Sequence, residues 1–158
     1  MSAPADTLVF TTDLPAPPGR VFAALTEARH LAHWFCDRAT SEPGIGGELS
    51  LGWERPGATA ETFTGRWEEF APDRACAYAG GHASYPGGSA GRVLFALEPA
   101  GAGTRLLTRH VLPDRPEFDA IAARYREAWP RALARLAAYL APGSPQMAPV
   151  TEAPDRED

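Results

Sequence analysis

Residues 121–140, IAARYREAWPRALARLAAYL, carry one long helical pattern. Apolar side chains recur in this stretch at spacings of four, four, four, three and four residues, which places them on one face of an α-helix. They are Ile121, Tyr125, Trp129, Leu133, Leu136 and Leu140. The preceding Asp114-Arg-Pro-Glu117 predicts the capped start of the helix, and Pro130 predicts a kink inside it. About 26 residues at ~1.5 Å each span ~39 Å, enough to cross a whole domain.

The sequence before this helix predicts short strands and two short helices. A strand-like segment at residues 7–14 ends at a run of prolines, and residues 18–25 and 27–34 then favour short amphipathic helices. Polar and apolar side chains alternate after that with period two, as in antiparallel strands with one buried face. These strands cover residues 48–53, 62–68, 75–79, 92–98 and 104–111. The sequence therefore predicts an α+β fold, with a curved antiparallel sheet of six to seven strands wrapped around the long kinked C-terminal helix.

Composition indicates one domain followed by a tail. Residues 7–141 form a single unit, and we predict a disordered tail at residues 142–158, which hold four prolines and no aromatic residue.

No apolar run approaches the roughly 18–20 residues that span a bilayer, and the amino terminus lacks the pattern of a secretion signal. With only two cysteines, we expect a cytoplasmic protein without a disulfide framework. The bias toward Ala, Gly, Pro and Arg is typical of GC-rich coding, and we expect a bacterial source.

Charge excludes several function classes. All 15 basic residues are arginine, so the chain has no lysine for a Schiff base or for a phosphate-binding loop. The net charge of −5 argues against nucleic acid as a partner and against an anionic membrane. We expect neither nucleic-acid binding nor membrane insertion.

Six short motifs resemble a known superfamily in their order and spacing. They are Pro17-Pro18-Gly-Arg-Val-Phe-Ala-Ala-Leu-Thr26, His30-Leu-Ala-His-Trp-Phe35, Gly46-Gly47-Glu-Leu, Phe63-Thr-Gly65, Gly103-Thr-Arg-Leu and Tyr125-Arg-Glu-Ala-Trp-Pro-Arg-Ala-Leu133. Together they resemble the helix-grip proteins of the START/SRPBCC superfamily, most closely the branch of homologues of the activator of heat-shock-protein-90 ATPase. The resemblance covers roughly residues 7–141. It implies a seven-strand-type sheet gripping the last helix, with an apolar cavity between them.

Three other patterns are judged structural. Gly87-Gly-Ser89-Ala-Gly91 has the spacing of a nucleophile elbow, but it lies in a Gly-rich loop that leads into a strand. Residues 44–47 carry glycines without a helix behind them, so they predict a turn. His30, His33 and Cys36 are spaced like metal ligands, yet we expect both histidines at the surface. We therefore expect no metal, no cofactor and no disulfide between Cys36 and Cys76.

The candidate site faces the cavity that the resemblance implies. If Leu106 and Thr108 point inward, His110 does so too, because side chains alternate along a strand. The candidate ligand-binding residues are Trp53, Phe63, Trp67, Tyr78, Phe95, His110, Tyr125 and Trp129. The alternative is ordinary core packing, but a buried polar atom without a partner costs ~1–3 kcal/mol, so His110 and the tyrosines need a partner, a water or a ligand.

Three functions follow from this site. The leading interpretation is a binding module that holds a small lipophilic or aromatic molecule, which would enter by loops 82–91 and 56–60. The second is an enzyme, a cyclase or hydrolase, with His110 as general base and Glu61 or Tyr78 assisting, although no convincing catalytic set is present. The third is a chaperone-interacting domain, weakened because family activators carry an additional domain that we do not expect here. A homodimer is left open.

Overall fold

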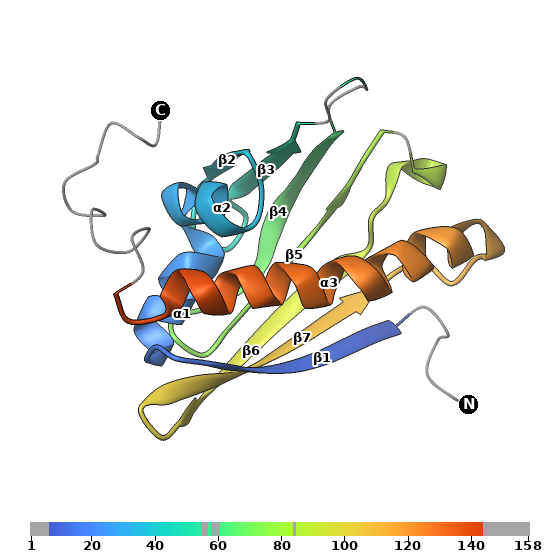
Figure 1. Cartoon of the computed structure of the whole chain (residues 1–158). Coiled ribbons are helices and arrows are strands. Elements are labelled where there is room, and N and C mark those ends of the chain that lie inside the picture. Colours follow the sequence, from blue (N-terminus) through green and yellow to red (C-terminus); the bar gives the residue numbers. More distant parts are fainter. Residues whose placement is uncertain (1–6, 55–56, 58–60, 84, 144–158) are drawn as a thin grey trace.

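The computed structural model describes residues 7–54, 57, 61–83 and 85–143. Its frame is one seven-stranded antiparallel sheet in the order β1-β7-β6-β5-β4-β3-β2 (Figure 1). The strands are β1 (Thr7–Leu14), β2 (Arg38–Ser41), β3 (Glu48–Trp53), β4 (Glu61–Ala71), β5 (Ala75–Gly81), β6 (Arg92–Ala100) and β7 (Gly103–Val111). Apart from β1, neighbours in the sheet are also neighbours in the sequence, so short turns join most pairs. The predicted α+β architecture is confirmed.

Two short helices follow β1. Helix α1 (Pro18–Thr26) begins with a proline at its first position, where the missing N–H is not needed for a helical hydrogen bond. Helix α2 (Ala28–Trp34) starts two residues after α1 ends, because Glu27 takes an extended backbone conformation between them. The Trp34 indole N–H donates to the Ala24 carbonyl at 2.8 Å and fixes the angle between the two helices.

Helix α3 (Asp119–Leu140) lies across the sheet, with α1 and α2 near its C-terminal end (Figure 1). The helix continues through Pro130, and the kink expected there stays a prediction. The helical stretch begins at Pro116, inside the predicted Asp114–Glu117 start, but Asp114 does not cap it. A 3-10 turn, η2 (Pro116–Phe118), comes first, and no side chain caps α3. Phe118 is fully buried against Leu112 and draws the chain into this tighter turn.

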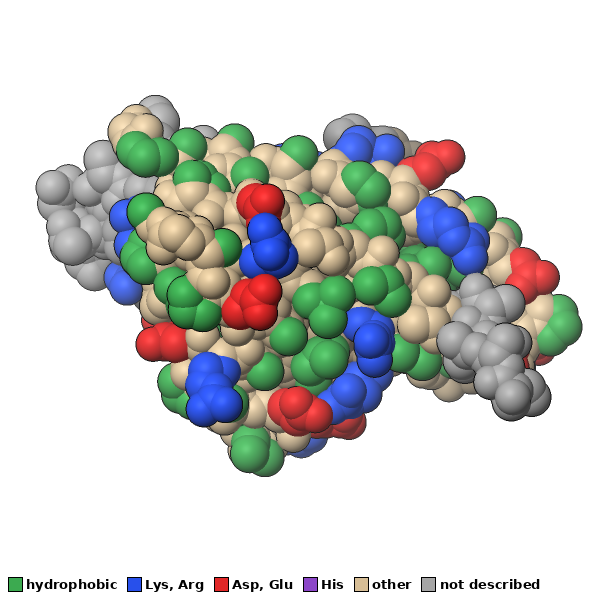
Figure 2. Space-filling view, turned by 90° about the horizontal axis from the view of Figure 1, so that it is seen from below, with side chains coloured by type: hydrophobic (Ala, Val, Ile, Leu, Met, Phe, Trp, Pro, Cys, Tyr) green, Lys and Arg blue, Asp and Glu red, His purple; other side chains and the backbone are tan. Residues whose placement is uncertain are grey.

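The core lies between the sheet and the three α-helices. Strand β7 shows the predicted alternation most clearly, since its even-numbered residues from Thr104 to His110 are buried. The opposite side of the sheet carries ion pairs such as Arg92 with Glu68 at 2.8 Å and Arg105 with Asp13 at 3.1 Å. Figure 2 shows arginine and acidic side chains next to one another on the face seen from below. One face of the sheet is therefore packed and the other is wet, as predicted.

Two further sequence predictions concern the C-terminal tail and membrane insertion. The tail expected to be disordered lies outside the described residues except for 142–143. In the described part of the chain, no helix is both long and apolar enough to cross a membrane.

Candidate ligand-binding pocket

A pocket of about 180 Å³ lies between the sheet and α3. Strands β3 to β7, helix α3 and the loop before β6 all contribute residues to it. The pocket reaches the surface beside Arg124 and Arg135, two exposed residues of α3, and Glu61, half-buried at the start of β4. The other lining residues are Phe35, Leu51, Trp53, Phe63, Tyr78, His82, Tyr85, Ala90, Gly91, Val93, His110, Tyr125, Ala128, Trp129 and Ala132.

Aromatic rings make up much of the wall. Phe35, at the end of α2, stacks on Trp129 with ring centres 5.6 Å apart and meets Trp53 edge-on at the same distance. On the sheet side, Phe63 and Tyr78 pack edge to face at 5.3 Å. The Trp53 indole N–H donates to the Phe35 carbonyl at 2.8 Å. This wall offers flat apolar surfaces suited to a planar molecule.

His110 is held on both sides by the protein itself. The Trp129 indole N–H donates to Nδ1 of His110 at 3.0 Å. Because an indole nitrogen is only a donor, Nδ1 is the unprotonated nitrogen of the ring. Nε2 therefore carries the hydrogen and donates to the Ala90 carbonyl at 2.8 Å. His110 links α3, β7 and the loop before β6, with both nitrogens occupied.

Burial keeps His110 neutral. Desolvation lowers the pKa of His110 from 6.5 to about 4, and the hydrogen bond to Ala90 opposes this only partly. A general base at neutral pH needs an accessible lone pair and a pKa near the working pH. His110 has neither in this structure, which argues against the role considered for it in an enzyme.

The loop between β5 and β6 brings two further aromatic residues to the pocket. The Tyr85 hydroxyl lies 3.3 Å from the Tyr125 hydroxyl, and the His82 ring packs on Tyr85 at 4.5 Å. Gly91 ends this loop with φ +81°, and a Cβ there would collide with the Val111 carbonyl. The other expected loop, 56–60, lies outside the described residues except for Gly57.

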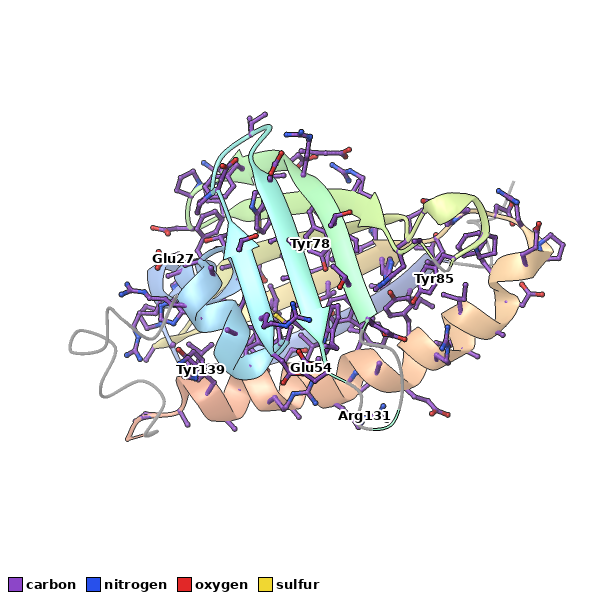
Figure 3. All side chains as sticks on the ribbon, turned by 90° about the horizontal axis from the view of Figure 1, so that it is seen from above. Glu27, Glu54, Tyr78, Tyr85, Arg131 and Tyr139 are labelled. Carbon is purple, nitrogen blue, oxygen red and sulfur yellow. The ribbon has the colours of Figure 1, made fainter. Side chains whose placement is uncertain are left out.

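Tyr78 lies deeper, in the middle of the sheet, whereas Tyr85 lies at one end of it (Figure 3). Only 6% of Tyr78 is exposed, and burial raises the pKa of its hydroxyl well above the usual value of 10. The hydroxyl has no hydrogen-bond partner among the described residues. It is a neutral polar group in a largely apolar wall.

The structure brings six of the eight predicted ligand-binding residues to the pocket: Trp53, Phe63, Tyr78, His110, Tyr125 and Trp129. Trp67 and Phe95 are buried in the core beside it and do not line it. The Trp67 indole is occupied by a hydrogen bond to the Ser41 hydroxyl at 3.1 Å. Whether any of the eight binds a ligand stays a prediction.

Sequence reasoning missed Phe35, His82 and Tyr85 as lining residues. Phe35 directly follows the predicted second helix, residues 27–34, and the other two lie in a loop without periodicity. The aromatic residues inside the Gly-rich loop were the available signal, because a solvent-exposed loop has little use for them.

The expectation of two surface histidines is wrong for His30. Its Nδ1 lies 2.6 Å from the Tyr139 hydroxyl, and α3 covers it, so that it is buried; His33 is half-buried and stacks on Tyr139. Within the described residues, no three His, Cys, Asp or Glu side chains are grouped as metal ligands. Cys36 and Cys76 are buried free thiols, and desolvation raises their pKa values to about 11 and 12.

A curved antiparallel sheet that grips a C-terminal helix over a partly hollow core defines the helix-grip class of the START/SRPBCC superfamily. Within this class, the chain belongs to the family of Activator of Hsp90 ATPase homolog 1-like proteins, whose model matches residues 15–141. No curated protein sequence matches the chain.

Several solved structures share the fold. A protein from Rhodobacter sphaeroides is 25% identical with a TM-score of 0.74, over 88% of this chain and 95% of that one. Protein CV1439 from Chromobacterium violaceum is 23% identical with a TM-score of 0.70, over 87% and 98%. The Aha1 dimer from Colwellia psychrerythraea is 17% identical with a TM-score of 0.67, over 89% and 98%. The last two show the fold alone.

Proposed function

We propose that this protein binds a small lipophilic or aromatic molecule in the pocket between the sheet and α3. The observation that carries the proposal is a pocket of about 180 Å³ with an aromatic wall and charged groups only where it reaches the surface. Such pockets, mostly apolar with a few placed polar groups, are the usual form of small-molecule sites.

The volume of the pocket favours a bound molecule and limits the size of that molecule. If it were dry and empty, about 180 Å³ would cost ~4 kcal/mol at ~24 cal/mol per Å³. This is a large part of the ~5–15 kcal/mol that stabilises a domain. An engineered apolar cavity of ~150 Å³ in another protein binds benzene. The pocket therefore suits a molecule of one aromatic ring or two fused rings.

Binding is favoured over catalysis by the state of His110. Its nitrogens are bonded to Trp129 and Ala90, so it shapes the wall and leaves no lone pair for a substrate proton. The chaperone-interacting function rests on the family name alone. That function, a homodimer and the cytoplasmic location stay predictions.

The test is native mass spectrometry of freshly purified protein, together with a variant that fills the pocket. Ala128 lines the pocket on α3, and Ala138 lies on the same helix in an exposed position. Leucine ranks just below alanine in helix propensity, so either substitution costs the helix little. We expect the wild type and Ala138→Leu to carry the same co-purified small molecule, or to bind indane when it is added.

Ala128→Leu is expected to lose at least tenfold in affinity for indane while its unfolding midpoint stays within a few degrees of the wild type. Equal affinity in both variants would place the ligand elsewhere. Wild-type protein that carries no small molecule and binds none of the added aromatic compounds would refute the proposed function.

A further inference from the structure

The polar groups of the pocket wall differ in whether the protein already satisfies them. His110 uses both ring nitrogens, and the indole nitrogens of Trp53 and Trp129 donate to Phe35 and His110. The Tyr85 and Tyr125 hydroxyls lie within hydrogen-bond distance of each other. His82, in the loop between β5 and β6, has a hydrogen bond with the Thr62 backbone. The Tyr78 hydroxyl differs from these groups, because no described residue bonds it.

The Tyr78 hydroxyl faces the pocket. Tyr78 lines the pocket and is 6% exposed. Among the described residues, Thr108 Oγ1 is the one side-chain polar atom that is both fully buried and unbonded, so the unbonded Tyr78 oxygen retains some accessible surface. Because Tyr78 lines the pocket, we infer that this surface borders the hollow between the sheet and α3.

The position of this hydroxyl is fixed. The Tyr78 ring packs edge to face on Phe63 at 5.3 Å and on Trp67 at 5.7 Å, and Phe95 lies 6.3 Å away on the next strand. Since these neighbours are themselves buried, the ring has little freedom to turn away from the pocket. A phenol oriented before the ligand arrives loses little conformational entropy when it forms a hydrogen bond.

Charge is confined to the outer part of the pocket. Arg124 and Arg135 are exposed, and Glu61 is half-buried. The buried end holds the neutral His110 and the Tyr78 hydroxyl. A carboxylate or ammonium group placed at that end would lose its water without meeting an opposite charge.

We propose that Tyr78 is the polar anchor of the pocket, donating its hydroxyl hydrogen to a neutral acceptor, such as a ring carbonyl, on the buried edge of a planar molecule of one or two rings. This inference rests on the proposed function and narrows it from lipophilic or aromatic molecules in general to neutral aromatic compounds with an acceptor on one edge. Charged substituents on the ligand then lie at the outer end, near Glu61 and Arg124.

The test compares two probes of nearly the same shape, 1-indanone, which has a ring carbonyl, and indane, which lacks it. Their dissociation constants are measured by isothermal titration calorimetry with the wild type, Tyr78→Phe and the matched control Tyr139→Phe. Tyr139 is another buried tyrosine, but its hydroxyl bonds His30 at the other end of α3. Thermal unfolding confirms that each variant is folded.

We expect the wild type and Tyr139→Phe to bind 1-indanone about tenfold more tightly than indane, the difference that one well-placed hydrogen bond gives. In Tyr78→Phe the order reverses: the carbonyl gives up water and gains no partner, while indane, which leaves the Tyr78 hydroxyl without a partner in the wild type, binds at least as tightly as before.

Equal binding of the two probes by the wild type would overturn the anchor and leave the proposed function standing. The same holds if Tyr78→Phe keeps the preference for 1-indanone. If neither probe binds the wild type, the proposed function fails together with the anchor. The wild-type comparison of the two probes decides the question even if Tyr78→Phe does not fold.

Discussion

The two halves of α3 meet the sheet differently. Its first half borders most of the pocket, through Tyr125, Ala128 and Trp129, and Ala132 and Arg135 border the rest. Beyond Arg135, the residues Leu136 and Leu140 are buried in the core and line no part of the pocket. The same helix and the same sheet thus enclose a hollow at one end and a packed core at the other.

The short helices account for the difference. Helices α1 and α2 lie beside the second half of α3, where Val21, Leu25 and Leu31 are buried (Figure 1). Beside the first half lies the loop between β5 and β6, where Tyr85 meets Tyr125 and the glycines add few side-chain atoms. At each end, a buried histidine forms a hydrogen bond with an aromatic residue of α3. His30 bonds Tyr139, and His110 bonds Trp129. Helices α1 and α2 fill the space beside the second half of α3, and among the described residues neither of them reaches the first half, where the pocket lies.

The largest effect is expected from removing core atoms at the packed end. Leu136→Ala should lower the free energy of unfolding by about 4 kcal/mol, because a fully buried leucine leaves a cavity that its neighbours cannot fill. Leu51→Ala, at the pocket wall, should cost only about 2 kcal/mol, since leucine atoms that face a hollow have fewer contacts to lose. Urea unfolding measures both variants. Equal costs would mean that the hollow is filled in solution.

The second prediction concerns the pH dependence of the free energy of unfolding, which His110 controls at the end of the fold that holds the pocket. Because folding lowers the pKa of His110 from 6.5 to about 4, the unfolded chain binds the proton more readily. Stability is therefore complete above pH 6.5 and falls as the pH drops toward 4. His110→Gln keeps a donor and an acceptor but does not titrate. Between pH 7 and pH 5 the wild type should lose about 2 kcal/mol more than this variant.

Urea unfolding at the two pH values checks this prediction. His30 serves as an internal reference, because desolvation also lowers its pKa to about 4 and it is present in both proteins. If the wild type and the variant lose stability equally, His110 is not the buried neutral group that the structure places beside Trp129.

The smallest change in the free energy of unfolding is expected on β7. Two buried threonines four residues apart, Thr104 and Thr108, differ there in whether the hydroxyl has a hydrogen-bond partner. The Thr104 hydroxyl donates to the Ala16 carbonyl at 2.7 Å, while the Thr108 hydroxyl has no partner in the described structure. Thr108→Val should raise the free energy of unfolding by about 1 kcal/mol, and Thr104→Val should lower it by about the same amount. Thermal unfolding of the pair checks the signs. A loss of stability in Thr108→Val would reveal a partner such as a bound water.

Much of the fold followed from the sequence, because it depends on periodicity. The spacing from Ile121 to Leu140 predicted α3, and the alternation from Thr104 to His110 predicted the buried face of β7. The start of α3 did not follow. The acidic and proline signals at Asp114 and Pro116 suit a cap, but the burial of Phe118 decides the geometry, and burial is a tertiary effect.

The pocket was less predictable. Alternation correctly indicated which side chains point inward, but it could not separate Tyr78, which lines the hollow, from Trp67, which packs beside it. Hydrogen-bond partners were also out of reach. That Trp129 and Ala90 occupy His110, and that Tyr139 covers His30, depends on contacts between segments far apart in the sequence.

The chain of hydrogen bonds from Trp129 through His110 to Ala90 has a mechanical consequence. It connects helix α3, strand β7 and the loop beside the pocket in series, and the Ala90 amide in turn donates to the Gly80 carbonyl at 2.7 Å. A molecule that displaces the Trp129 indole would therefore disturb the loop as well. A slower or faster rate of hydrogen–deuterium exchange at the Ala90 amide would then report that a ligand has displaced the Trp129 indole.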